Sequence, residues 1–187
     1  MNARSYPAIN VWELDRSAIG ATIAAVQRPG RDGKEGGVFW IGTRGQNSVV
    51  RAVVIPAGEG VMEDASFWRV TPEVFGTVSR WASERTWSLL GICHTHGDGI
   101  PAKLSTQDRA HLVRAPGLLA VVIGSSGRDD NPQRWGWYEF TSGVYRAIGS
   151  GERQRRLCLT NDAEAEVWTA DRHGCRPVAN LWPATPR

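Results

Sequence analysis

The pattern of apolar and polar positions divides the chain into segments of two kinds. Short apolar runs bounded by glycine or turn residues predict strands at Ala8–Leu14, Gly36–Gly42, Ser48–Pro56, Leu89–Cys93, Leu118–Ile123, 135–140 and 144–148. Apolar residues at helical spacing predict helices at Ala18–Gln27, Thr71–Arg85 and Ser105–Val113. Because the two kinds are interspersed, we expect an α/β fold, an α+β mixed sheet flanked by helices.

The C-terminal part has weaker patterns. Arg156–Leu159 and Val167–Thr169 are predicted as a further hairpin, and the basic run 153–156 as a solvated edge or turn, with contact to an acidic partner as the alternative. Residues 177–187 contain three prolines and predict a loosely ordered tail. We therefore expect a single domain over residues 1–176.

Composition narrows the class of protein. Lys and Arg exceed Asp and Glu by 22 to 19, an imbalance too small to require a nucleic-acid partner. The three cysteines form no CxxC pair, the N-terminus lacks a signal peptide's apolar stretch, and no apolar run is long enough to span a bilayer. These features predict a soluble cytoplasmic protein with no membrane partner. The nine Trp are spread along the chain, which favours packing roles, although a groove lined by some of them stays open.

One short segment combines residues that bind metals. His94 and His96 follow the apolar run Leu89–Cys93, and along a strand residues two apart point to the same side. Asp108 comes three residues after Ser105, a predicted helix N-cap, so it lies in the first helical turn. Two His and one Asp leave a fourth position open, as in catalytic zinc sites. Taken alone, residues 105–108 are also a capping box, and a single such His is more often structural.

A metal-activated water requires a base. A bound zinc lowers the pKa of water toward about 7, and a carboxylate outside the ligand shell can take the proton. Glu35, at the start of a Gly-flanked apolar segment, is our candidate, with Glu59, Glu63 and Asp98 as competitors and a surface-loop role as the alternative. Ser105 could donate a hydrogen bond to a developing oxyanion, a contribution of about 3 kcal/mol in known cases.

These residues resemble a known family. The pattern His94-Thr95-His96 with Ser105-x-x-Asp108, preceded by Glu35, is similar to the JAMM signature of the JAB/MPN zinc metalloproteases. The resemblance covers roughly residues 18–148. It implies a cytidine-deaminase-like JAB/MPN fold, one catalytic Zn²⁺ held by the two His and the Asp, and general acid/base and oxyanion roles for the Glu and the Ser.

The chain departs from the family pattern at two places. Gly97–Leu104 places eight residues between the second His and the Ser, where the family usually has seven that begin with Pro. A glycine often found three residues after the Glu is replaced by Val38. The first departure puts the position of Ser105 in question, and the second puts the register of Glu35 in question.

The resemblance implies an activity and partners. Family members are isopeptidases that cut ubiquitin or ubiquitin-like proteins from conjugates, and the chain looks most like bacterial JAB peptidases of conjugation operons linked to antiviral defence. The implied partners are a ubiquitin-like protein or its conjugates, with E1- and E2-like enzymes of the same operon. The alternatives are a catalytically silent MPN-like scaffold and a metal hydrolase of a small amide or a sulfur-carrier substrate.

Two residues near the segment have simpler interpretations. Strand alternation points Cys93 away from both His side chains, so we interpret it as a buried small hydrophobe. His111 lies one helical turn beyond Asp108 and could support the site, but a surface or core position is the favoured interpretation.

Overall fold

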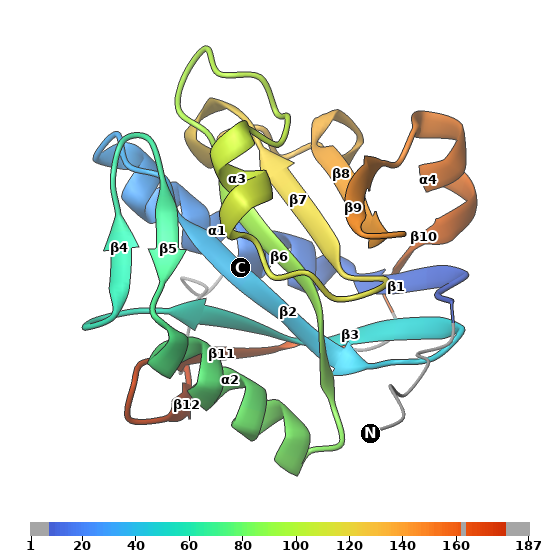
Figure 1. The fold of residues 1–187 in the computed structure, drawn as a ribbon, viewed down its shortest axis with the longest axis horizontal. Coiled ribbons are helices and arrows are strands. Elements are labelled where there is room, and N and C mark those ends of the chain that lie inside the picture. The colour runs from blue at the N-terminus through green and yellow to red at the C-terminus, as the bar shows by residue number, and fades with distance from the viewer. Residues whose placement is uncertain (1–7, 162–163, 179–187) are drawn as a thin grey trace, which may run out of the picture.

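The computed structural model describes residues 8–161 and 164–178, which form a curled mixed sheet with helices on both faces (Figure 1). Its main strands are β1 (Val11–Asp15), β2 (Gly37–Thr43), β3 (Asn47–Pro56), β6 (Ser88–Thr95), β7 (Leu119–Ile123), β8 (Gly136–Thr141), β9 (Val144–Ala147), β10 (Leu157–Thr160), β11 (Glu166–Ala170) and β12 (Cys175–Pro177). They follow the order β10-β1-β3-β2-β6-β7-β8-β9, with β11 paired to β3 and β12 paired to β11. The predicted α/β fold is confirmed.

Four α-helices accompany the sheet. They are α1 (Arg16–Arg31), α2 (Pro72–Glu84), α3 (Thr106–His111) and α4 (Ser150–Arg156), and two short 3-10 turns follow β7 at η1 (Ser125–Gly127) and η2 (Pro132–Arg134). Asp15 caps α1 by accepting a hydrogen bond from the Ser17 amide, and Pro72 is the first residue of α2, where its missing N–H costs nothing. α1 covers one face of the sheet, whereas α2 and α3 lie on the other.

Each face has its own hydrophobic core. Trp40, Leu90 and Cys93 pack with α1, whereas Phe39 and Ile92 pack with α2. Tryptophan fills much of both cores, because Trp12, Trp40, Trp81, Trp135 and Trp137 are buried. Trp182 lies outside the described residues.

Three elements differ from the sequence expectation. α1 continues past Gln27 to Arg31, because Pro29 is buried in its last turn and packing there outweighs a missing N–H donor. A small separate sheet forms from β4 (Val61–Glu63) and β5 (Trp68–Val70), strands too short to show a period. The basic run 153–156 lies in α4, not in a turn, and Arg156 pairs with Glu139 and Glu152.

The predicted hairpin between 156–159 and 167–169 is wrong. β10 runs parallel to β1, and β11 runs parallel to β3. β3 has ten residues, and β1 pairs only with its first part at Asn47–Val49, so Ala52–Pro56 remains free to pair with β11. The two segments therefore complete the sheet at different places instead of pairing with each other.

Of the predicted tail, Pro177 lies in β12 and 179–187 lie outside the described residues. Within the described part of the chain, no helix combines the length and the apolar character needed to cross a membrane.

Candidate metal centre

The pairing of β2 with β6 brings Glu35 to the two histidines. These strands are antiparallel, with Gly37 opposite His94, and the Thr95 amide donates to the Gly36 carbonyl at 2.9 Å. The paired register ends at Gly37 and His94, and Glu35 and His96 each lie two residues beyond that pair. Glu35 is close enough to His96 and Asp108 for the charges of these groups to shift its pKa, so the carboxylate lies beside the histidines. The Thr95 hydroxyl, which accepts a hydrogen bond from the Gly36 amide at 2.9 Å, fixes this register from the opposite side.

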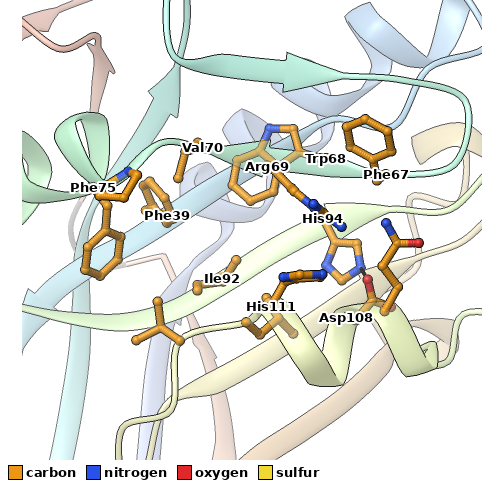
Figure 2. A pocket seen from close by; sticks show the side chains of 14 residues that line it. Phe39, Phe67, Trp68, Arg69, Val70, Phe75, Ile92, His94, Asp108 and His111 are labelled. Atoms are coloured by element: carbon orange, nitrogen blue, oxygen red, sulfur yellow. Dashed lines mark ion pairs between the residues drawn. The ribbon is translucent and has the colours of Figure 1, made fainter.

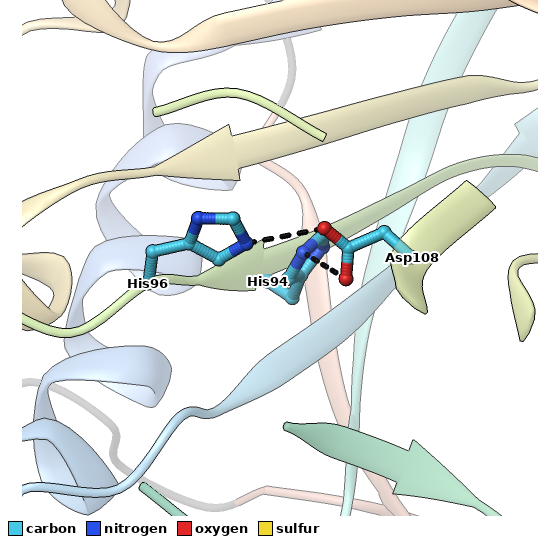
Figure 3. A group of neighbouring side chains, drawn as sticks. All are labelled: His94, His96 and Asp108. Carbon is cyan, nitrogen blue, oxygen red and sulfur yellow. Dashed lines mark hydrogen bonds and ion pairs between the residues drawn. The ribbon is translucent and has the colours of Figure 1, made fainter. Parts of the chain in front are cut away.

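The three predicted ligands converge at the end of β6 (Figure 3). His94 Nε2 lies 3.2 Å from Asp108 Oδ1, and His96 Nε2 lies 3.2 Å from Asp108 Oδ2. One ligand atom from each of the three residues lies within 4.8 Å of the other two. Both histidines are buried, at 3% and 4% exposed, so their orientation is held by the surrounding core. The three residues could hold a metal ion, as the sequence predicted.

The hydrogen bonds of the histidines test whether the group suits a cation. His96 Nδ1 lies 3.1 Å from the Pro101 carbonyl, so this nitrogen carries a proton. In the neutral ring, Nε2 then presents a lone pair to Asp108 Oδ2, 3.2 Å away, unless a second proton or a metal cation lies between them. A lone pair facing a carboxylate oxygen is unfavourable unless positive charge lies between them. Buried His94 Nε2, which lies 3.2 Å from Asp108 Oδ1, has no hydrogen-bond partner among the described residues, and neither does its Nδ1. Two imidazole nitrogens and one carboxylate, which all require a positive charge between them, are a donor set that fits a divalent metal.

The pKa shifts of Asp108 and His96 also indicate that the site favours positive charge. Burial alone would raise the pKa of Asp108, but its contacts with His94 and His96 hold it below its usual range. Burial alone would lower the pKa of His96, but its hydrogen bond to Asp108 and the charges of Asp108 and Glu35 raise it. The carboxylate therefore stays ionised and attracts a cation to the histidine nitrogens.

A capping box holds Asp108 in place. Its Oδ2 accepts a hydrogen bond from the Ser105 amide at 2.7 Å, while the Ser105 hydroxyl oxygen accepts one from the Asp108 amide at 3.0 Å. The alternative interpretation of residues 105–108 is thus confirmed: they form a capping box at the start of α3, and the same bonds hold the Asp108 carboxylate toward the histidines. These bonds span only one helical turn, so the relation of Ser105 to Asp108 does not depend on the length of the preceding loop.

The longer loop Gly97–Leu104 is anchored by its own contacts. Asp98 accepts hydrogen bonds from the Ser126 hydroxyl at 3.0 Å and from Arg128 at 2.6 Å, and Leu104 is buried at the end of the loop. Ser105 itself is exposed, and its hydroxyl uses its oxygen as an acceptor in the capping box, so its hydrogen remains available to a ligand.

Glu35 has the environment of an acid/base group. Its side chain is 6% exposed, and burial raises its pKa to about 7, with His96 opposing and Asp108 adding to the shift. The competing carboxylates lie elsewhere: Glu59 is exposed and pairs with Arg172, and Asp98 pairs with Arg128. Glu63 is exposed on β4, near Lys34 and Arg28. Glu35 is the carboxylate that the structure brings to the ligand group.

A cavity of about 340 Å³ opens beside the ligand group (Figure 2), and Trp68 lines it, in keeping with the Trp-lined groove that the composition left open. One wall comes from β5, through Trp68, Arg69 and Val70, and another from α3. The sequence signal for the β5 wall was the pair of adjacent aromatic residues Phe67 and Trp68. This pair belongs to no periodic pattern, so the sequence did not place it in a strand. The cavity makes His94 and Asp108 accessible to a ligand.

The two neighbouring residues behave as predicted, with one addition. Cys93 is fully buried in the core on the α1 face, away from the histidines. His111 is exposed at the end of α3, but it also lines the cavity.

Comparisons with known proteins concern the family and the fold. A family model described as prokaryotic homologs of the JAB domain matches residues 21–138. The solution structure of protein DSY2949 from Desulfitobacterium hafniense is similar in fold, with 16% identity and a TM-score of 0.57 over 82% of this chain and 96% of that one. The crystal structure of AF2198, a JAB1/MPN domain protein from Archaeoglobus fulgidus, matches with 10% identity and a TM-score of 0.45 over 80% and 98%. No curated protein matches the chain.

Proposed function

This chain belongs to the prokaryotic homologs of the JAB domain, and we propose that it is a zinc-dependent peptidase or isopeptidase that hydrolyses the bond after the C-terminus of a ubiquitin-like protein. The observation that carries the proposal is the position of Glu35 beside a group of three residues that could hold a metal ion, two of which line a cavity. A metal site that served only to stabilise the fold would use four protein ligands and would need no buried carboxylate of raised pKa next to it.

Each residue of the site has a separate role in the proposed hydrolysis. When bound to His94, His96 and Asp108, a zinc ion supplies a Lewis acid that makes water a nucleophile near neutral pH. Glu35 accepts the proton of the attacking water and delivers it to the leaving amine, since a pKa of about 7 permits both steps. The Ser105 hydroxyl donates a hydrogen bond to the oxyanion that forms as the carbonyl is attacked.

The surroundings suit a substrate in extended form. Among the described residues, β5 pairs only with β4, so the other edge of β5 is free to bind a peptide as an added strand. This edge borders the cavity that contains His94 and Asp108. A ubiquitin-like C-terminus is such an extended segment, and E1- and E2-like enzymes of the same system would supply its conjugates.

A coumarin-release assay tests the activity. Ubiquitin and small sulfur-carrier-type ubiquitin-like proteins, each with an aminocoumarin amide at the C-terminus, are incubated with zinc-loaded protein. We expect release from at least one of them, loss on chelation, and a decrease of at least about a hundredfold in Glu35→Gln, as for removal of a general base. Glu59→Gln, at an exposed carboxylate, is the matched control and should retain activity.

The same assay separates the alternatives. Equal release by wild-type protein and Glu35→Gln, or no release from any protein amide, would remove the isopeptidase proposal. Release only from a short acetylated amide would favour a small-amide hydrolase. An absence of hydrolysis in every arm, together with zinc binding, would leave a scaffold role.

A further inference from the structure

The cavity beside the ligand group has an apolar end and a polar end (Figure 2). At the apolar end Phe39 meets Trp68 and Phe75 edge-on, with ring centroids 5.7 and 5.9 Å apart, over Ile92. A volume of about 340 Å³ is at the small end of ligand pockets and matches one bulky side chain with its adjoining backbone. The apolar end therefore favours a large apolar group.

The polar end presents hydrogen-bond donors and almost no acid. Its side chains are Arg69, Gln107 and His111, and Asp108 is the only carboxylate among the described lining residues. Both oxygens of Asp108 already face the histidine nitrogens. Gln107 and His111 can each donate or accept, whereas Arg69 can only donate and carries the positive charge of this end, which suits a ligand with a negative charge.

Arg69 is the charged member of this end. Its guanidinium lies 5.2 Å from the ring centroid of Phe67 and, among residues 8–161 and 164–178, has no ion pair or hydrogen bond. Its side chain extends from β5 over the cavity in the direction of His94 (Figure 2). A half-buried guanidinium held against an aromatic ring is already oriented and partly desolvated, so a carboxylate partner would gain more there than at an open surface.

A second cavity indicates that the occupant is extended. This space of about 230 Å³ shares Phe75 and Val113 with the first and continues between α2 and β6 past Leu89. Two adjoining spaces along one strand fit a chain that passes through them better than a compact molecule.

We propose that this groove selects a substrate segment that places a bulky apolar side chain against Phe39 and Phe75 and an acidic side chain against Arg69. The inference rests on the proposed peptidase function and names the substrate class of the same site. It concerns an acidic side chain within the segment, so peptides with amidated C-termini are the appropriate probes.

Peptide binding tests the proposal without catalysis. The protein is Glu35→Gln, treated with chelator, and the probes are fluorescent, amidated six-residue peptides in a Ser/Gly background. Each carries one Phe and one Glu at varied spacing, with Gln or Lys replacing the Glu in matched sets. By anisotropy we expect at least one spacing to bind about fivefold more tightly with Glu than with Lys, the upper range for an exposed ion pair. Replacing Phe by Ser should cost more than about tenfold.

Charge reversal distinguishes recognition from a structural role. Arg69→Glu should reverse the preference in favour of the Lys peptides, whereas Arg80→Glu, at an exposed position of α2 outside the cavity lining, should leave it unchanged. An equal effect of both variants would mean that net charge alone sets the preference. That result would overturn the proposal. So would equal binding of Glu and Lys peptides by the parent protein, or equal binding of peptides with and without the Phe.

The outcome is independent of the coumarin assay. A peptide preference that follows Arg69, without cleavage of any ubiquitin-like amide, would retain this inference and remove the proposed function. Cleavage of a ubiquitin-like amide without a preference for Glu peptides would retain the proposed function and remove this inference.

Discussion

Glu35→Gln in the metal-free protein should change the pH dependence of stability by a calculable amount. The pKa of Glu35 is raised from 4.5 to about 7, mainly by burial. Between these two values the folded state keeps a proton that the unfolded state has lost, so the free energy of unfolding falls as pH rises. A shift of this size corresponds to about 3 kcal/mol, lost between roughly pH 4.5 and 7. Gln has nearly the same shape and cannot ionise, so the variant escapes this loss.

Chemical denaturation at pH 4.5 and pH 8.5 measures the difference, with chelator present throughout. The free energy of unfolding of Glu35→Gln, relative to that of the wild-type protein, should increase by about 3 kcal/mol from the lower to the higher pH. For a chain of this size, this equals roughly 6–12 °C in thermal midpoint. Glu59→Gln is the control for loss of a carboxylate, because 69% of the Glu59 side chain is exposed to solvent, whereas Glu35 is buried. If the Glu35→Gln difference is the same at both pH values, Glu35 is not buried beside the histidines as described.

Three further predictions concern the ligand group and its supports. Zinc at about a hundredfold excess over its dissociation constant should stabilise the wild-type protein by about 2.7 kcal/mol in thermal unfolding, and His96→Ala should abolish the effect; an equal shift in both would place the metal elsewhere. Ser105→Ala should cost about 1 kcal/mol of stability as a lost cap and at least about a hundredfold in kcat as a lost oxyanion donor; a stability loss with unchanged kcat would reduce Ser105 to its capping role. Gly136→Ala should destabilise by about 1–3 kcal/mol in urea titration, because an added Cβ would lie 2.0 Å from the Ala102 carbonyl in the loop before Ser105, and an unchanged midpoint would contradict this contact.

Elements that depend on neighbouring residues were predictable. The ligands His94, His96 and Asp108 occupy one strand, one loop and one helical turn, so period-two alternation and an N-cap rule suffice to bring them together. The Asp15 cap of α1 and Pro72 at the start of α2 fit the same local rules, whereas the Thr71 side chain makes no capping hydrogen bond. Local patterns failed where tertiary contacts outweighed them, as at Pro29 in the last turn of α1, or where the strand was too short, as in β5.

The sequence by itself determined that His94, His96 and Asp108 form one group, because these residues interact over one short segment. Glu35 was one of four candidate carboxylates, and the pairing of β2 with β6 brought it near His96. The partners of β10 and β11 and the cavity under β5 were likewise decided by pairing between segments far apart in the chain. Such pairings depend on which edges other strands leave free, and no local pattern carries that information.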